Sequence, residues 1–179
     1  EIRLQDLPQI EREYEDLAEY IHETREVGDA VHFFHFIMDM KGGPCVYKRL
    51  KGCGVGAEYC AVTPDGDIYP CHQFVGETDF RMGNVRDMSR ITDEKGNLLP
   101  EKTTEDILDP KVRKVFFDRL MPNREHCKTC FARYTCGGGC PANSMHATGD
   151  LDGQYEVGCR LAKKRLECSL WLAVAEQDA

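Results

Sequence analysis

Ten cysteines in a chain of 179 residues constrain the fold more than any other feature of this sequence. Residues 1–12 are polar and acidic and do not resemble a secretory signal peptide, so we expect a cytoplasmic protein. Thiols stay reduced in the cytosol, where a high cysteine count favours metal binding over disulfide bonds. The cysteines therefore predict metal centres that organise the fold.

Five cysteines form a dense group in the second half of the chain. Their spacing is Cys127-x2-Cys130-x5-Cys136-x3-Cys140, followed by Cys159. The Cys-x2-Cys pair lets two thiolates converge from one turn, and the glycines at 137–139 permit tight backbone conformations beside a bulky cluster. Five ligands are one too many for a four-ligand site. A closely spaced run can send one cysteine to a second cluster, and Cys140, which precedes Pro141, is the candidate.

A β-hairpin is predicted in the first half of the chain. Strands over residues 59–63 and 67–69 flank residues 64–66, where an early proline and a late glycine indicate a tight turn. A three-residue turn places Thr63 opposite Asp67. This pairing sets the register of the whole hairpin.

The hairpin lies between Cys53 and Cys71, which are the candidates, with Cys140, for a second metal centre. In the predicted register Cys60 faces Pro70, the neighbour of Cys71. Because adjacent strand residues point to opposite faces, Cys60 then points away from Cys71 and shares its iron only through a bulge. The fourth ligand of this centre therefore stays open, and the cluster has either four protein ligands or three and one open iron.

Zinc is an alternative, because zinc sites with four cysteine ligands also use Cys-x2-Cys pairs. The irregular spacings and the number of cysteines favour two four-iron clusters instead. Cys168 falls within a predicted helix and is expected to pack as a small hydrophobic residue, whereas Cys45 lies in a loop and either packs likewise or serves as a spare ligand. His72 and His126 each adjoin a candidate ligand, and we expect them to support it rather than bind metal.

The rest of the sequence divides near residue 42. The expected elements are an amphipathic helix over 7–27, a strand covered on both faces over 31–40, a helix over 110–120 capped by Asp109, and a last helix over 160–175. The apolar residues expected to face the core of the two later helices are Val112, Val115, Phe116, Leu120, Leu161, Leu166, Leu170, Trp171 and Val174. Residues 1–40 look like one α/β unit cut from a larger domain, and a start without Met suggests a fragment.

Charge and hydropathy exclude two classes of partner. The net charge is −8, and no Lys or Arg run is long enough to make a basic face, which argues against nucleic-acid binding. No apolar stretch approaches the ~20 residues that a membrane-spanning helix requires. We therefore expect a protein that contacts neither nucleic acid nor membrane.

Several spaced segments together resemble a known domain. They are Cys53-Gly54-Val55-Gly56, Val62-Thr63-Pro64-Asp65-Gly66-Asp67-Ile68-Tyr69-Pro70-Cys71, Arg81-Met82-Gly83-Asn84-Val85 and Cys136-Gly137-Gly138-Gly139-Cys140-Pro141-Ala142. With Cys159, they resemble the SPASM domain, the C-terminal extension of many radical SAM enzymes that modify peptides. The similarity covers about residues 45–175. Residues 43–53 carry a finer similarity to the thioether-forming maturases of six-cysteine (SCIFF, sactipeptide-type) peptides.

The resemblance implies an α+β fold in two parts. Residues 42–179 would form a cysteine-rich SPASM domain, with a β-hairpin and short helices around two 4Fe–4S clusters, and residues 1–41 the last helix and strand of a partial (β/α) barrel. The first auxiliary cluster would be bound by Cys53, Cys71 and Cys140, with Cys60 or an outside group as fourth ligand. The second would be bound by Cys127, Cys130, Cys136 and Cys159.

The resemblance also implies a function for the whole enzyme. Radical SAM enzymes hold their catalytic cluster with Cys-x3-Cys-x2-Cys, and this sequence has no such motif. S-adenosylmethionine and a third 4Fe–4S cluster would therefore belong to an N-terminal core missing from this chain, and no catalytic residue is assigned here. The expected role is electron transfer, with substrate thiolate binding, during thioether formation in a cysteine-containing precursor peptide. The alternatives are a ferredoxin-like electron carrier and a zinc-binding interaction module.

Overall fold

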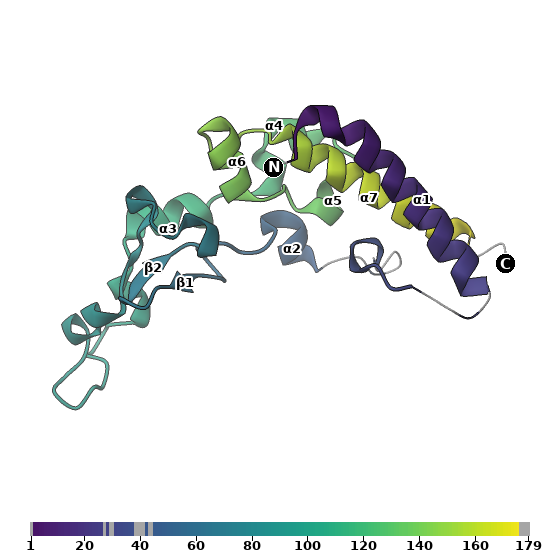
Figure 1. The fold of residues 1–179 in the computed structure, drawn as a ribbon. Coiled ribbons are helices and arrows are strands. Elements are labelled where there is room, and N and C mark those ends of the chain that lie inside the picture. The colour runs from purple at the N-terminus through teal and green to yellow at the C-terminus, as the bar shows by residue number, and fades with distance from the viewer. Residues whose placement is uncertain (1, 27, 29–30, 38–41, 43–44, 176–179) are drawn as a thin grey trace.

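The computed structural model describes residues 2–26, 28, 31–37, 42 and 45–175. The chain forms an elongated, bent assembly with two long helices at one end, a small sheet at the other and short helices between them (Figure 1). This mixture of helices and a small antiparallel sheet agrees with the predicted α+β class. None of the described helices has both the length and the apolar character to cross a membrane.

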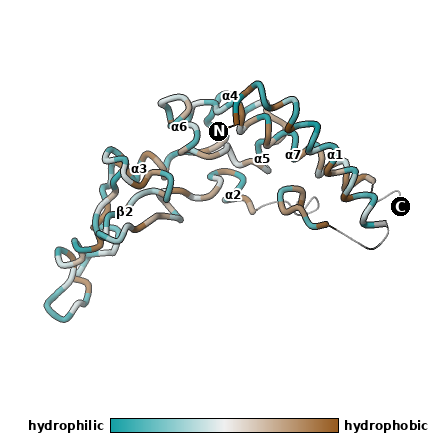
Figure 2. Tube along the Cα trace, in the orientation of Figure 1, coloured by the Kyte–Doolittle hydropathy of each residue, from teal (hydrophilic) through white to brown (hydrophobic). Residues whose placement is uncertain are grey.

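Helices α1 (Leu7–Glu26) and α7 (Glu156–Ala175) lie side by side (Figure 1). Apolar residues recur at helical spacing along both, between hydrophilic ones (Figure 2). Ala18 and Ile21 of α1 are buried against Cys168 and Leu172 of α7. The predicted first helix and the packing role of Cys168 are therefore confirmed.

The strand expected over residues 31–40 is wrong for the part that is described. Phe34–Phe36 form a turn of 3-10 helix, and residues 38–40 lie outside the described residues. A strand needs a neighbour for its backbone hydrogen bonds, and the sheet of this chain is formed by other segments. Phe33 and Phe36 instead contact the ring of Tyr14 on α1.

The sheet has three antiparallel strands in the order β1-β2-β3. They are β1 (Ala61–Val62), β2 (Asp67–Tyr69) and β3 (Gly83–Asn84). The pairing of Ala61 with Tyr69 puts Thr63 opposite Asp67, and the backbone N–H of Thr63 donates to the carbonyl of Asp67 at 2.9 Å. The predicted hairpin and its register are confirmed.

Helix α3 (Pro110–Phe117) begins where predicted and ends three residues early. The Asp109 carboxylate caps it by accepting from the backbone N–H of Lys111 at 2.7 Å and of Val112 at 3.3 Å. The sequence did not predict the remaining described α-helices, which are α2 (Val46–Lys51), α4 (Glu125–Lys128), α5 (Arg133–Cys136) and α6 (Pro141–Thr148).

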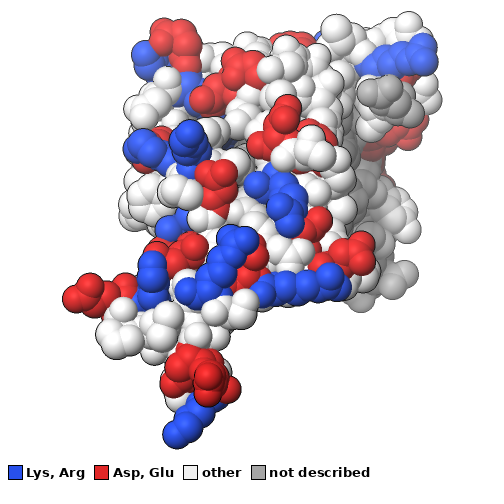
Figure 3. Space-filling model, turned by 90° about the vertical axis from the view of Figure 1, so that its left-hand side faces the viewer, with Lys and Arg blue, Asp and Glu red and all other residues white. Residues whose placement is uncertain are grey.

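Burial along the two later helices agrees with the sequence only in part. Phe116, Leu161 and Leu166 are buried as expected. Val112 and Leu120 are only partly buried, and Val115, Leu170, Trp171 and Val174 are exposed. On the face of the molecule shown in Figure 3, acidic and basic side chains are interspersed, so this face has no continuous basic area of the kind that nucleic-acid binding requires.

Candidate iron–sulfur sites

One cavity of about 670 Å³ collects the dense group of cysteines. Its lining includes Cys127, Cys130, Cys136, Cys140 and Cys159. The volume is roughly twenty times the ~30 Å³ that a water molecule occupies in the liquid, which is room for a group of many atoms. Among the described residues, no three His, Cys, Asp or Glu side chains form a group that could hold a single metal ion. The donor set and the space together fit a polynuclear cluster with thiolate ligands.

The glycines at 137–139 shape one wall of this cavity. Their φ angles are +66°, +91° and +74°. All three residues are therefore in the left-handed region, which residues with a Cβ rarely adopt. A Cβ on Gly137 would lie 2.7 Å from the carbonyl oxygen of Lys48 and 2.9 Å from Cα of Gly52. The predicted tight backbone is confirmed, and it lets the end of α2 approach, which places Cys53 beside this loop.

Four of the cysteines that line the cavity lie near one another, and two of them, Cys127 and Cys159, have a raised pKa. Burial raises the pKa of Cys127, and the nearby thiols of Cys136 and Cys130 raise that pKa further. Burial likewise raises the pKa of Cys159, again with contributions from Cys136 and Cys127. The structure therefore brings together the four cysteines expected at the second cluster. Metal binding by such thiols requires that they lose their protons.

A second set of thiols meets at Cys71, which is buried next to the sheet. Burial raises the pKa of Cys71, hydrogen bonds from the backbone of Gln73 and Phe74 lower it, and the thiols of Cys140 and Cys53 raise it. The amide of Gln73 also donates to the sulfur of Cys140 at 3.4 Å. Cys140 packs against the hydrophobic core around Cys71 and lines the cavity as well. It lies between the two sets of thiols.

The remaining candidates lie apart from this arrangement. Cys60 is exposed. The carbonyl of Pro70, the residue predicted to face Cys60, accepts a hydrogen bond from the backbone N–H of Gly56 at 3.1 Å. Cys45 is also exposed, so it does not pack as a small hydrophobic residue. Neither thiol lines the cavity.

The two histidines beside candidate ligands have different environments. His126 lines the cavity, and its pKa is lowered, first by burial and then by the charge of Arg124. The Nδ1 atom of His72 lies 3.2 Å from the hydroxyl of Tyr59. Each histidine can therefore help to orient the adjacent cysteine without binding the metal itself.

Sequence reasoning missed three polar residues at these sites: Gln73, Arg119 and Arg124. The charges of Arg124 and Arg119 oppose the effect of burial on the pKa of Cys127. Burial and the charge of Arg124 lower the pKa of Arg119 itself. The position of Arg124, three residues before Cys127, was the only signal available, and it does not reveal that the side chain is buried.

Comparison with known proteins identifies part of this arrangement. Residues 53–93 match the family model of SPASM, an iron-sulfur cluster-binding domain. This segment carries Cys53, Cys60 and Cys71. The SPASM resemblance is therefore confirmed for residues 53–93, the segment that contains the hairpin.

Two curated relatives extend the similarity beyond the SPASM segment. A serine-type anaerobic sulfatase-maturating enzyme of Klebsiella aerogenes is 30% identical over 115 residues, which are 63% of this chain and 23% of that protein. A protein of Archaeoglobus fulgidus, described as uncharacterized, is 32% identical over 104 residues, 57% of this chain and 21% of that protein. The matched segment is less than a quarter of the length of either relative.

Proposed function

We propose that this chain is the auxiliary-cluster part of a radical SAM enzyme that modifies a ribosomally made peptide. The observation that carries the proposal is the cavity of about 670 Å³ lined by five cysteines. The SPASM match and the relative named as a sulfatase-maturating enzyme support it. In this proposal the radical SAM core, with S-adenosylmethionine and its own cluster, precedes this chain in the same protein.

The proposal assigns the two sets of thiols to two 4Fe–4S clusters. Cys127, Cys130, Cys136 and Cys159 hold one, and Cys53, Cys71 and Cys140 hold the other. When bound, such clusters transfer single electrons at potentials set by ligands, hydrogen bonds and burial. The protein's own contribution is to gather the thiols, to bury Cys71 and Cys127, and to leave Cys53 exposed. An exposed ligand at the first site leaves access for an outside group, such as a substrate thiolate.

The finer proposal is a thioether bond between a cysteine sulfur and an α-carbon of the precursor peptide. An exposed approach to the first site suits it, because a peptide thiol must reach the bound iron. Mass spectrometry of a cysteine-containing precursor after turnover by the complete enzyme tests this step. A crosslinked product whose cysteine resists alkylation supports it, and modification of a serine or of no residue refutes it.

Iron and sulfide quantification tests the cluster assignment. After anaerobic reconstitution, Cys53→Ala and Cys127→Ala should each lose about four irons, the content of one cubic cluster. Cys45→Ala is the matched control, because Cys45 is exposed and lies outside both sets; it should keep the full iron content. Retention of all iron in both ligand variants, or a colourless protein that binds zinc, would refute the assignment.

A further inference from the structure

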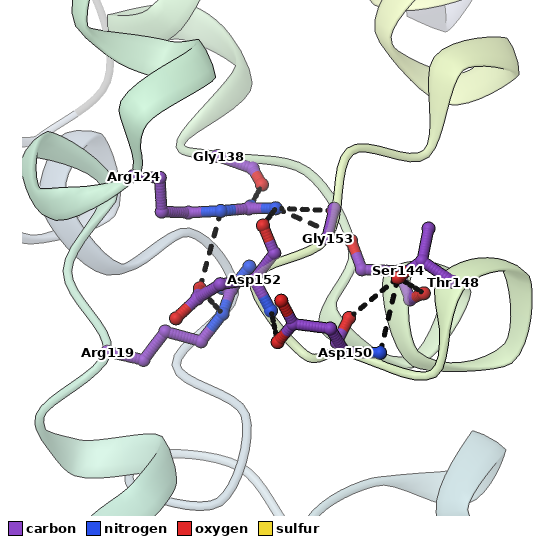
Figure 4. Close-up of polar contacts among 8 residues, drawn as sticks. All are labelled: Arg119, Arg124, Gly138, Ser144, Thr148, Asp150, Asp152 and Gly153. Atoms are coloured by element: carbon purple, nitrogen blue, oxygen red, sulfur yellow. Dashed lines mark hydrogen bonds and ion pairs between the residues drawn. The ribbon is translucent and has the colours of Figure 1, made fainter.

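Arg124 lies where three segments meet: the start of α4, the loop at Gly138 and the loop before α7. Figure 4 shows its contacts with the two loops. Its side chain is 2% exposed. One end of the guanidinium donates to the carbonyl of Gly138, in the loop between Cys136 and Cys140. The other end donates to the carbonyls of Asp152 at 3.2 Å and Gly153 at 3.0 Å, in the loop before α7.

The backbone of Arg124 holds the third of these segments. Its carbonyl accepts from the N–H of Cys127 at 3.0 Å, at the start of α4. Arg124 therefore links the turn before Cys127, the glycine loop after Cys136 and the loop before α7, the helix that contains Cys159. The planar guanidinium has five donors in a rigid fork, so it can hold several acceptors in one geometry.

Two buried guanidinium groups lie together at this point, near the carboxylate of Asp152 and that of the exposed Asp150, which accepts from the backbone N–H of Asp152 at 2.9 Å. The side chain of Arg119 is 6% exposed and lies beside Arg124. The Asp152 carboxylate serves both arginines, with Oδ1 2.9 Å from Nε of Arg119 and 3.4 Å from Nε of Arg124. Two guanidiniums thus share one carboxylate, which is itself 54% exposed. Nη2 of Arg119 is buried without a hydrogen-bond partner among the described residues.

We infer that Arg124 positions the ligands of the second cluster, that Arg124 and Arg119 raise its reduction potential, and that the carboxylate of Asp152 lowers that potential. The inference rests on the proposed function, because it assumes a cluster bound by Cys127, Cys130, Cys136 and Cys159. One-electron reduction adds one negative charge to that cluster. A buried positive charge stabilises the more negative state, and surroundings of low dielectric strengthen the effect. Arg124 lines the cavity, so its charge acts at short range.

Three variants separate the electrostatic role from a mechanical one. Arg124→Gln removes the charge and part of the fork, whereas Arg124→Lys keeps the charge. Asp152→Asn removes the negative charge but leaves the main-chain carbonyl that accepts from Arg124. Arg113→Gln is the matched control, because Arg113 forms a two-pronged ion pair with Glu105 on the surface of α3.

The measurement is an anaerobic redox titration followed by EPR, with iron quantified in the same samples. Arg124→Gln should shift one of the two auxiliary-cluster potentials to more negative values, and Asp152→Asn should shift the same potential to more positive values. Arg124→Lys should keep the potential closer to that of the wild type than Arg124→Gln does. Arg113→Gln should change neither.

Opposite shifts support the inference, because a clamp without an electrostatic role would not give the two variants opposite signs. If Arg124→Gln fails to retain the cluster, the direction in which Asp152→Asn shifts the reduction potential tests the inference instead. An unchanged or more negative potential in Asp152→Asn overturns the inference. A Cys127→Ala variant that keeps all of the iron found in the wild type contradicts the proposed function itself. The failure of the inference and the failure of the proposed function are therefore distinguishable.

Discussion

Replacing Gly137 with alanine should destabilise the protein by about 2–5 kcal/mol, from two separable causes. The φ of +66° costs a residue with a Cβ about 1–2 kcal/mol. The added Cβ would also lie 2.7 Å from the carbonyl oxygen of Lys48 and 2.9 Å from Cα of Gly52. Both atoms belong to the backbone, so α2 or the glycine loop must move, at a further cost of about 1–3 kcal/mol.

The matched control is Gly149→Ala at the end of α6. Gly149 has φ +75°, and a Cβ there would meet nothing within 4 Å. Its cost should be about 1–2 kcal/mol, from conformation alone. Urea unfolding under anaerobic conditions gives both free energies, and equal m values show that both variants unfold the same amount of structure. Equal losses would refute the close packing of α2 on the glycine loop, and with it the placement of Cys53 there.

Three further predictions concern the scaffold. Asp109→Ala should cost about 1 kcal/mol by removing the cap of α3, measured by thermal unfolding. Ile21→Ala should lower the free energy of unfolding by about 2–5 kcal/mol, because the side chain of Ile21 on α1 is buried against α7. Tyr20→Ala, on the exposed side of α1, should lower it far less. Burial raises the pKa of Cys168, so its stabilising contribution is complete below the ordinary thiol pKa and lost as pH rises through the raised value. Alkylation read by mass spectrometry should therefore modify exposed Cys45 well before Cys168, and equal rates would contradict this burial.

Features set by neighbouring residues could be predicted from the sequence. The Pro64-Asp65-Gly66 turn fixed the hairpin register, and Asp109 marked the start of α3, because both effects act within a few residues. The spacing also indicated that the five closely grouped cysteines lie near one another, and all five line one cavity. In each case the physical cause is local backbone geometry or the small number of ways in which closely spaced ligands can converge.

Features set by distant contacts could not be predicted in this way. The apolar run at 31–37 indicated burial, but the sheet formed elsewhere, and Phe36 packs on a helix pair instead. Trp171 was expected to be buried, yet it is 44% exposed because α1 covers only one side of α7. Arg124 carried no sign of burial, since charged residues are rarely buried unless partners from separate loops surround them.

The most direct test of the account is the EPR spectrum of the reduced, anaerobically reconstituted protein. Two auxiliary clusters on separate thiol sets predict two distinguishable signals beyond any from a radical SAM core. Cys71→Ala should remove or alter one signal, and Cys130→Ala the other. Loss of the same signal in both variants, or spectra unchanged from the wild type, would contradict the division of these cysteines into two cluster sites.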